Sequence, residues 1–384
     1  MQPVGPPGEL LADMLAELLA EELAELLAEE LVELLADVLG EEPPEPALPE
    51  EPQPPSTIEP AATASQNRWV LTTQVSMRWV TPCVPSGVLG SKKSRRKATT
   101  TTSRSHMSDV PNITLNNGVE IPQLGFGVFQ IEPERTKDAT LAALEVGYRH
   151  IDTAEMYGNE KEVGEAVRAS GVDRSDIFVT SKLNNGFHAY DAALDAFEGT
   201  LKDLDIDYLD LFLVHWPLPD VGDYVETWKA MEKIYAGGRV KAIGVSNFQP
   251  HHLRRIHGET SVTPAVNQVE IHPYLANEEV RAFDAEHGIA TEAWSPIAQG
   301  KVLKDPTIVR VADNLGRTPA QVTLRWHIQR DDIVFPKSVT RAHVEENFAI
   351  FDFELSDEDM AAITGLDKGE RTGPDPDTFN YVPK

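Results

Sequence analysis

Four polar side chains with complementary acid–base chemistry follow consecutive strand-like runs of the sequence. Asp152 ends one apolar run, and Tyr157 follows it by five residues in what reads as a loop. Lys182 comes directly after the next run, and His215 comes directly after the one beyond that. Parallel α/β proteins build their chemistry at the carboxyl ends of strands. The spacing therefore predicts that these four side chains meet at one site.

A phenol, an ammonium and a carboxylate together can deliver a proton. A tyrosine acts as a general acid near neutral pH if something lowers its pKa from about 10. We expect Lys182, held by Asp152, to lower the pKa of Tyr157 in this way. Each side chain also has a structural interpretation: a buried ion pair for Asp152 and Lys182, loop packing for Tyr157, and a core histidine for His215. Their occurrence at three successive strand ends favours an active site.

The elements that position these residues alternate regularly after a short hairpin. The hairpin is predicted at 113–115 and 119–121 around Asn116-Asn117-Gly118. Strand-like runs follow at 125–129, 149–152, 177–181, 209–214, 240–245, 265–270, 290–294 and 333–334. Amphipathic stretches lie near 133–146, 160–170, 189–204, 223–236, 250–257, 277–287, 306–330 and 341–350, with a further helix near 356–365. This order predicts an α/β protein, a (β/α)8 TIM barrel with an N-terminal hairpin and an extra C-terminal helix.

Other phosphate-binding and catalytic motifs are absent from the sequence. Gly125 and Gly127 form the only G-x-G near an early strand, and Gln130 stands where a dinucleotide fingerprint needs its third glycine. There is no P-loop, no G-x-S-x-G elbow, and no cluster of His, Cys, Asp and Glu with metal-ligand spacing. A doubly wound fold and a metal site are therefore disfavoured.

Charge divides the chain into an extension and a globular part. Residues 1–67 contain 16 acidic and no basic residues, 68–106 contain 8 basic and no acidic residues, and 107–384 contain 26 basic and 46 acidic residues. We expect 1–106 to be a low-complexity, disordered extension, an acidic leucine-rich helix followed by a basic linker, and 107–384 to be the barrel. The leucines recur every eight residues, so their stripe winds around a helix and disfavours a coiled coil. A partner-binding helix remains the alternative for this segment. We expect either that Met107 is the natural start or that 1–106 is a dispensable extension.

Composition also limits the setting of the protein. No run is apolar enough to span a membrane, and the basic run at 91–97 lacks the interleaved aromatic residues typical of nucleic-acid binding. The only cysteine is Cys83, so disulfides are not expected, and a reducing cytoplasm is. We expect a cytoplasmic monomer that acts on a small molecule, with no nucleic-acid or membrane partner.

Six motifs in sequence order resemble the signatures of the aldo-keto reductase superfamily. They are D-T-A-E-M-Y at 152–157, V-T-S-K at 179–182, L-V-H-W-P at 213–217, G-V-S-N-F at 244–248, N-Q-V-E-I-H-P at 267–273 and F-P-K-S-V at 335–339. The chain is similar to the short bacterial members of the 2,5-diketo-D-gluconate reductase type over 113–380. Residues 1–106 have no counterpart in that family.

The resemblance implies a mechanism and a cofactor. Asp152, Tyr157, Lys182 and His215 match the catalytic residues, with Tyr157 as the general acid. Implied cofactor contacts are Ser246, Asn247, Gln268, Trp294, Ser295, Pro296, Ile297, Gln299, Gly300, Lys337, Ser338, Val339, Thr340, His343, Glu346 and Asn347. Implied substrate contacts are Phe129, Asn185, His215 and Trp216, in a pocket that the short tail leaves open.

The implied function is NADPH-dependent reduction of carbonyls in small aldehydes, ketoaldehydes or keto-sugar acids. His343 replaces the arginine usual at its position, so NADPH is expected to be preferred and NADH tolerated. Asn184 replaces a tryptophan often found after the lysine. Two alternatives stay open: an aldolase that uses Lys182 as a Schiff base, and a non-catalytic NADP-binding accessory subunit.

Overall fold

The computed structural model describes residues 110–383, and these form a single barrel. The predicted acidic helix and basic linker lie outside this range. Eight parallel strands lie side by side in sequence order from β3 to β10. They are β3 Phe126–Gly127, β4 His150–Asp152, β5 Phe178–Leu183, β6 Leu209–Val214, β7 Val240–Ser246, β8 Val266–Glu270, β9 Ala290–Trp294 and β10 Ile333–Val334.

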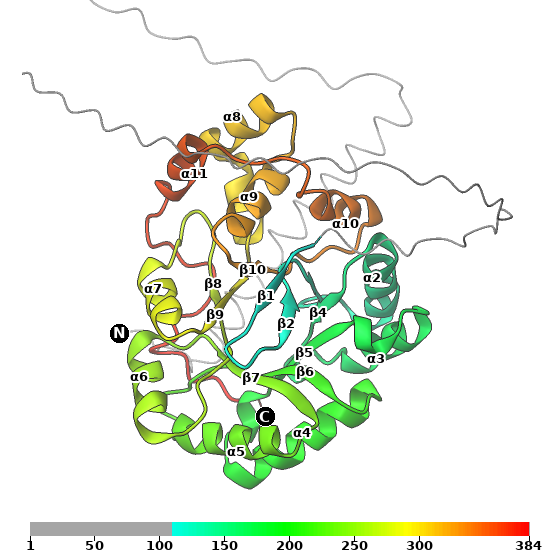
Figure 1. Ribbon diagram of the computed structural model, residues 1–384, viewed down its shortest axis with the longest axis vertical. Helices are drawn as coiled ribbons and strands as arrows, with labels where there is room; N and C mark the ends of the chain where they lie inside the picture. The colour runs from blue at the N-terminus through cyan, green and yellow to red at the C-terminus, as the bar shows by residue number, and fades with distance from the viewer. Residues whose placement is uncertain (1–109, 384) are drawn as a thin grey trace, which may run out of the picture. The chain divides into compact units, whose positions relative to one another are not determined.

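The sheet closes on itself between its first and last strands. Leu124 forms a parallel bridge with Val334, and the Gly125 N–H donates to the Val334 carbonyl at 2.7 Å. The helices surround the strands, as Figure 1 shows. The predicted (β/α)8 barrel is therefore confirmed. A closed parallel sheet matters for function because all of its carboxyl ends open on one face.

Ten α-helices are formed by the described residues. They are α2 Pro133–Val146, α3 Glu160–Ala169, α4 Tyr190–Leu204, α5 Tyr224–Ala236, α6 Pro250–Glu259, α7 Glu278–Glu286, α8 Pro306–Leu315, α9 Pro319–Ile328, α10 Arg341–Phe348 and α11 Asp357–Thr364. The extra C-terminal helix is α11. A short 3-10 turn, η1 (Glu155–Tyr157), carries Tyr157.

The stretch 306–330, predicted as one amphipathic segment, is two helices. Gly316 ends α8 in the left-handed conformation, with φ of 62°. Thr318 then caps α9 through a reciprocal capping box with Gln321, and Pro319 occupies the first helical turn. Glycine after a helix and proline at the start of the next are the usual stop and start signals. The prediction was wrong because hydrophobic periodicity was given more weight than these signals.

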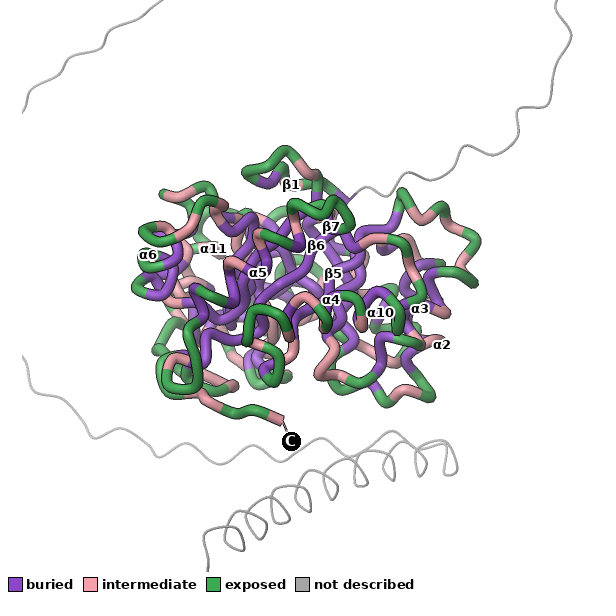
Figure 2. The backbone as a smooth tube through the Cα atoms, turned by 90° about the horizontal axis from the view of Figure 1, so that it is seen from below, coloured by how far each residue is buried: buried purple, intermediate pink, exposed green. Residues whose placement is uncertain are grey.

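The predicted hairpin closes the end of the barrel opposite the site. β1 (Asn112–Thr114) pairs antiparallel with β2 (Glu120–Pro122), and Gly118 in the turn has φ of 84°. The Asn117 side chain donates to the carbonyl of Lys241, at the start of β7. Figure 2 shows the hairpin at one end of the barrel, the C-terminus beyond the other, and buried residues concentrated between.

The strand that carries Lys182 is longer than predicted. β5 extends to Leu183, and Lys182 and Leu183 pair in register with Leu213 and Val214 of β6. The predicted run ends at Ser181, but the backbone ladder continues to Leu183, and the Lys182 side chain is fully buried. Of the helices described, none is long and apolar enough to cross a membrane.

Candidate active site

Asp152, Tyr157 and Lys182 meet at the carboxyl end of the barrel. The Lys182 ammonium donates to Asp152 Oδ1 at 2.7 Å, to the Thr153 carbonyl at 2.9 Å and to Tyr157 Oη at 3.3 Å. These three bonds use all three ammonium hydrogens. Because the phenol oxygen accepts from Lys182, the phenol proton remains free to be donated elsewhere.

Opposing effects act on the pKa values of this pair. Burial is the largest single effect on Lys182 and would lower its pKa, but the charges of and hydrogen bonds to Asp152 and Tyr157 together outweigh burial, so the pKa is raised and the lysine is charged. For Tyr157, burial raises the pKa and the nearby ammonium only partly offsets it, so the pKa lies above its usual value. Lys182 thus lowers the pKa of Tyr157 as expected, but the expected net lowering of that pKa was wrong. The reason is desolvation of the phenol, which disfavours its ionised form.

His215 follows β6 and faces the phenol. Its imidazole lies edge-on to the Tyr157 ring, with 5.9 Å between ring centroids. Burial, and then the charge of Lys182, hold the pKa of His215 well below its usual value, so the ring is neutral. Within residues 110–383 its buried Nδ1 has no hydrogen-bond partner. The four predicted catalytic side chains thus share one site, and the imidazole is available to a ligand.

A second carboxyl group approaches this site from inside the barrel. Gln268 Nε2 donates both to Asp152 Oδ2 at 2.9 Å and to Glu292 Oε2 at 2.8 Å. Gln268 and Glu292 are register partners on β8 and β9, so their side chains lie on the same face of the sheet. Sequence reasoning missed Glu292, although its position two residues before Trp294 places it on the same face as that residue.

Three residues predicted to hold the nicotinamide lie close together beside the catalytic residues. The Asn247 amide nitrogen donates to the His215 carbonyl at 3.0 Å and to Ser246 Oγ at 3.1 Å, and its backbone has φ of 67°. Asn247 Oδ1 accepts from Trp294 Nε1 at 2.8 Å. The indole edge is thereby fixed while its ring flanks the site.

The loop after β9 has an irregular backbone that suits an anion. Ser295, Ala298, Gln299 and Gly300 all have positive φ, between 49° and 88°. Successive residues of this kind turn backbone N–H groups into a concave surface that binds phosphate groups. His327 Nε2 lies 3.0 Å from the Pro296 carbonyl, and this contact connects the loop to α9. The predicted contacts Ser295, Pro296, Ile297, Gln299 and Gly300 all lie in this loop, and their role at a pyrophosphate remains a prediction.

The segment predicted to bind the 2′-phosphate leads into α10. Burial, with the nearby charge of Arg135, lowers the pKa of Lys337. The Ser338 hydroxyl accepts from the Thr340 N–H at 3.1 Å, and Val339 packs against the core. His343 is exposed. Two further predicted contacts, Glu346 and Asn347, lie near the end of α10, and Glu346 accepts from Thr318 Oγ1 at 2.6 Å.

Comparison with known proteins accounts for this arrangement. A family model described as "Aldo/keto reductase family" matches residues 123–368. An aldo-keto reductase of Mycobacterium sp. (strain KMS) is 51% identical over 272 residues, which cover 71% of this chain and 99% of the relative. The methylglyoxal reductase DkgA of Escherichia coli (strain K12) is 47% identical over 275 residues, with the same coverage. This chain belongs to the aldo/keto reductase family.

A solved structure extends the likeness to the cofactor. A crystal structure of a Gox0644 variant in complex with NADPH shares 42% identity, with a TM-score of 0.69, and it covers 71% of this chain and 100% of that one. Membership of the aldo/keto reductase family, together with this NADPH-bound relative, supports an NADP-dependent oxidoreductase. The resemblance to the 2,5-diketo-D-gluconate reductase type is confirmed by the match to DkgA.

The C-terminal tail of this aldo/keto reductase crosses the predicted substrate pocket. Phe379 packs on Trp216 with ring centroids 4.3 Å apart, and Asn185 Nδ2 donates to the Tyr381 carbonyl at 2.9 Å. Phe129, which is 53% exposed, packs against Tyr157, at 5.0 Å between ring centroids. The pocket is therefore partly covered by the tail, contrary to the expected open pocket, because a short tail still reaches the loops after β5 and β6.

A buried carboxylate anchors this tail. Glu270, at the end of β8, accepts from the backbone N–H and hydroxyl of Thr372 and from the N–H of Gly373 at 3.2 Å. Gly373 then lies so close to the indole of Trp294 that a Cβ there would be 2.4 Å from it. The tail thus packs against the indole ring of Trp294, the residue predicted to stack on the nicotinamide.

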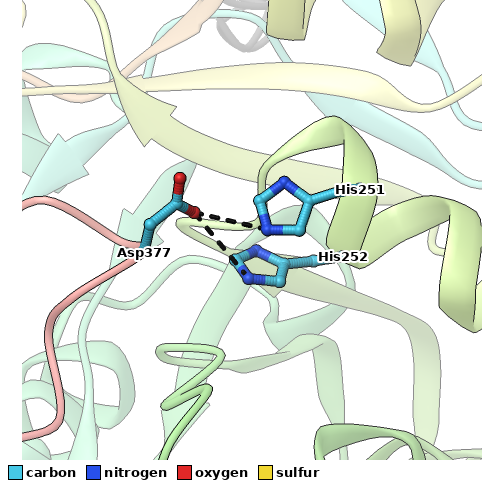
Figure 3. Close-up of side chains that lie close together, drawn as sticks. All are labelled: His251, His252 and Asp377. Atoms are coloured by element: carbon cyan, nitrogen blue, oxygen red, sulfur yellow. Dashed lines mark ion pairs between the residues drawn. The ribbon is translucent and has the colours of Figure 1, made fainter.

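A second tail contact brings together two histidines and an aspartate (Figure 3). Asp377 Oδ1 lies 3.5 Å from His251 Nε2 and 3.8 Å from His252 Nε2. The grouping looks like a metal site, but His252 Nδ1 accepts the Gln249 N–H in the capping box of α6. A neutral His252 therefore carries its proton on Nε2, facing Asp377, where a metal would need a free lone pair. The cluster is better suited to holding the tail than to binding a metal.

Proposed function

We propose that Tyr157 is the general acid in this reduction. The observation that carries the proposal is the contact between Lys182 and the phenol oxygen, which leaves the phenol proton free. A phenol with a raised pKa is fully protonated at neutral pH. It can still protonate the substrate, because an alkoxide is a much stronger base than a phenolate. The same raised pKa disfavours the reverse oxidation at neutral pH, since that direction needs the phenolate.

NADPH would supply the hydride to the carbonyl carbon. In this chain Ser246, Asn247 and Gln268 would hold the carboxamide, and Trp294 would flank the nicotinamide ring. The loop 295–300 would bind the pyrophosphate, and the segment 337–347 would bind the adenosine 2′-phosphate and the adenine. The positive-φ backbone of the loop and the hydrogen-bonded indole support these assignments.

His215 would orient the substrate. Its neutral imidazole can donate one hydrogen bond to the carbonyl oxygen, and a donor already in place where charge develops stabilises the transition state. Phe129, Trp216 and Asn185 would line the remaining space. Because the tail covers Trp216 and Asn185, we favour small aldehydes and ketoaldehydes over larger keto-sugar acids. The names methylglyoxal reductase and glyoxal reductase among the relatives agree with this substrate class.

Two competing functions are less well supported. A Schiff-base aldolase needs a neutral lysine amine that can attack a carbonyl. Lys182 is instead fully buried and charged, with all three hydrogens in hydrogen bonds. A non-catalytic accessory subunit would not need an intact acid, ammonium and carboxylate in contact. Both alternatives are therefore weaker than the reductase.

Replacing the acid tests the proposal directly. We expect Tyr157→Phe to lower kcat for methylglyoxal by about 10²- to 10⁴-fold, the usual contribution of a general acid. NADPH affinity, measured by quenching of tryptophan fluorescence, should be nearly unchanged. Retention of the wild-type kcat would remove Tyr157 from the mechanism, and loss of NADPH binding would indicate a structural role.

We further propose that residues 107–384 are sufficient for this activity and act as a monomer. All four catalytic residues and all eight barrel strands lie within this range. A chain that begins at Met107 should therefore match the full chain in kcat and melting temperature. A fall in melting temperature of more than a few degrees would show that residues 1–106 stabilise the barrel.

A further inference from the structure

Glu292 is a buried carboxyl group that the proposed mechanism does not use. It lies inside the barrel on β9 and is fully buried. Its Oε2 accepts from Gln268, whereas its Oε1 has no hydrogen-bond partner among residues 110–383. Burial raises the pKa of this carboxyl to about 8, so it is protonated at pH 7. Keeping such a group in a barrel is costly, which suggests that its contact with Gln268 matters.

Gln268 has one amide group and two acceptors beside it. Asp152 accepts from the Lys182 ammonium and from Gln268, so the atom of Gln268 that faces it is the amide nitrogen. The second hydrogen of the same nitrogen goes to Glu292. Both donors of the amide are then used inside the barrel. The amide oxygen accepts no hydrogen bond from any described residue, and it is the part of Gln268 left for a ligand.

The free oxygen is close to the predicted nicotinamide site. Ser246 is the register partner of Gln268 on β7, and Trp294 extends from the same face of β9 as Glu292. An amide oxygen accepts hydrogen bonds and cannot donate them. It therefore suits the amino group of the cofactor carboxamide and does not suit the carboxamide oxygen.

We propose that Glu292 is a positioning residue that holds the Gln268 amide with its oxygen toward the amino group of the nicotinamide carboxamide. The inference rests on the proposed role of Gln268. Asp152 alone would fix the amide nitrogen with a single bond, and the second bond to Glu292 prevents the side chain from rotating about it. The predicted consequence is discrimination against cofactors that lack the carboxamide amino group.

Binding of a cofactor analogue tests this without turnover. In 3-acetylpyridine adenine dinucleotide phosphate a methyl group replaces the amino group of the carboxamide. Calorimetry should show that the wild-type protein binds NADP⁺ roughly three- to tenfold more tightly than this analogue, the effect of about one hydrogen bond. Glu292→Leu and Glu292→Met remove the acceptor and should narrow that ratio. Glu292→Gln keeps an acceptor oxygen in place and should restore it.

Gln268→Met separates this inference from the assignment on which it rests. If Gln268→Met leaves the wild-type ratio intact, or if the wild-type protein shows no preference, the role of Gln268 is wrong. If Gln268→Met abolishes the ratio but folded Glu292→Leu and Glu292→Met keep it, only the role of Glu292 is overturned. Using both apolar replacements guards against one of them failing to fold, and circular dichroism checks each. If Glu292 had only a structural role, its replacement would lower the affinities for NADP⁺ and for the analogue by the same factor.

Discussion

The two ends of the barrel each hold a buried aspartate paired with lysine, and the two clusters differ in how far their cations are exposed. At the carboxyl end, Asp152 pairs with Lys182, whose side chain is 0% exposed. At the amino end, Asp210 near the start of β6 accepts from Arg174 and from Lys241, both at 2.8 Å, and these side chains are 22% and 44% exposed.

The surroundings of the two clusters explain why only one supports chemistry. Asp210 has two cations that reach water, and both lie over the ring of Tyr208. Asp210 also accepts from the Val179 N–H, so the cluster connects neighbouring strands of the barrel. Lys182 has no access to water and donates to a phenol that carries a transferable proton. A buried ammonium acts through a lower effective dielectric constant, so its charge has a larger effect on a neighbour.

Replacing the lysine of each cluster should give the largest difference in kcat between the two clusters. We expect Lys182→Met to lower kcat by about 10²- to 10⁴-fold, because Tyr157 would lose the cation that stabilises its phenolate. Lys241→Met makes the same chemical change at the amino end and should leave kcat unchanged. Steady-state kinetics with one aldehyde and saturating NADPH compare the two. Equal losses of kcat in both variants would mean that the clusters are not functionally distinct.

Matched aspartate replacements should differ in stability. Asp152→Asn leaves Lys182 buried without a carboxylate, and we expect the free energy of unfolding to fall by about 3–5 kcal/mol. Asp210→Asn leaves two cations that can be rehydrated, so a loss of about 1–2 kcal/mol is expected. Urea unfolding followed by circular dichroism measures both values. If Asp210→Asn were the more destabilising, exposure of the partner cations would not determine the cost.

The sequence predicts the positions of strands better than the chemistry of the groups they carry. β6, β9 and β10 match their predicted ranges because each is an apolar run with polar residues on either side. Lys182 was predicted to follow its strand because a polar residue ends an apolar run in the sequence. The backbone nevertheless continues in the strand conformation through Lys182. The hydrogen-bond ladder between neighbouring strands is a tertiary property that such a run does not encode.

The candidate site shows the same limit. The motifs identify Asp152, Tyr157, Lys182 and His215, and the structure brings them together. The direction of the Tyr157 pKa depends on how deeply the phenol is buried, which no local pattern reports. Glu292 and Glu270 are single carboxylates whose roles no local pattern in their strands indicates. Their partners lie 24 and 102 residues away along the chain, so only the folded structure reveals them.

The smallest predicted effect is a change in NADPH affinity when an exposed cation is introduced at position 343, in the segment predicted to bind the 2′-phosphate. Arg341, the nearest arginine in sequence, donates to Glu345 at 2.9 Å and to Glu145 at 2.6 Å, so two carboxylates already engage it. Arginine is always charged and binds a phosphate with two hydrogen bonds, whereas histidine is only partly charged near neutral pH.

We expect His343→Arg to bind NADPH roughly three- to tenfold more tightly, a small gain because solvent and salt screen the added charge. NADH, which lacks the 2′-phosphate, should be unaffected, and His343→Gln should change neither cofactor much. Titration at low and high salt measures this, and the gain should shrink as salt rises, whereas the loss of kcat in Lys182→Met should not. An equal shift for both cofactors would show that His343 does not face the phosphate.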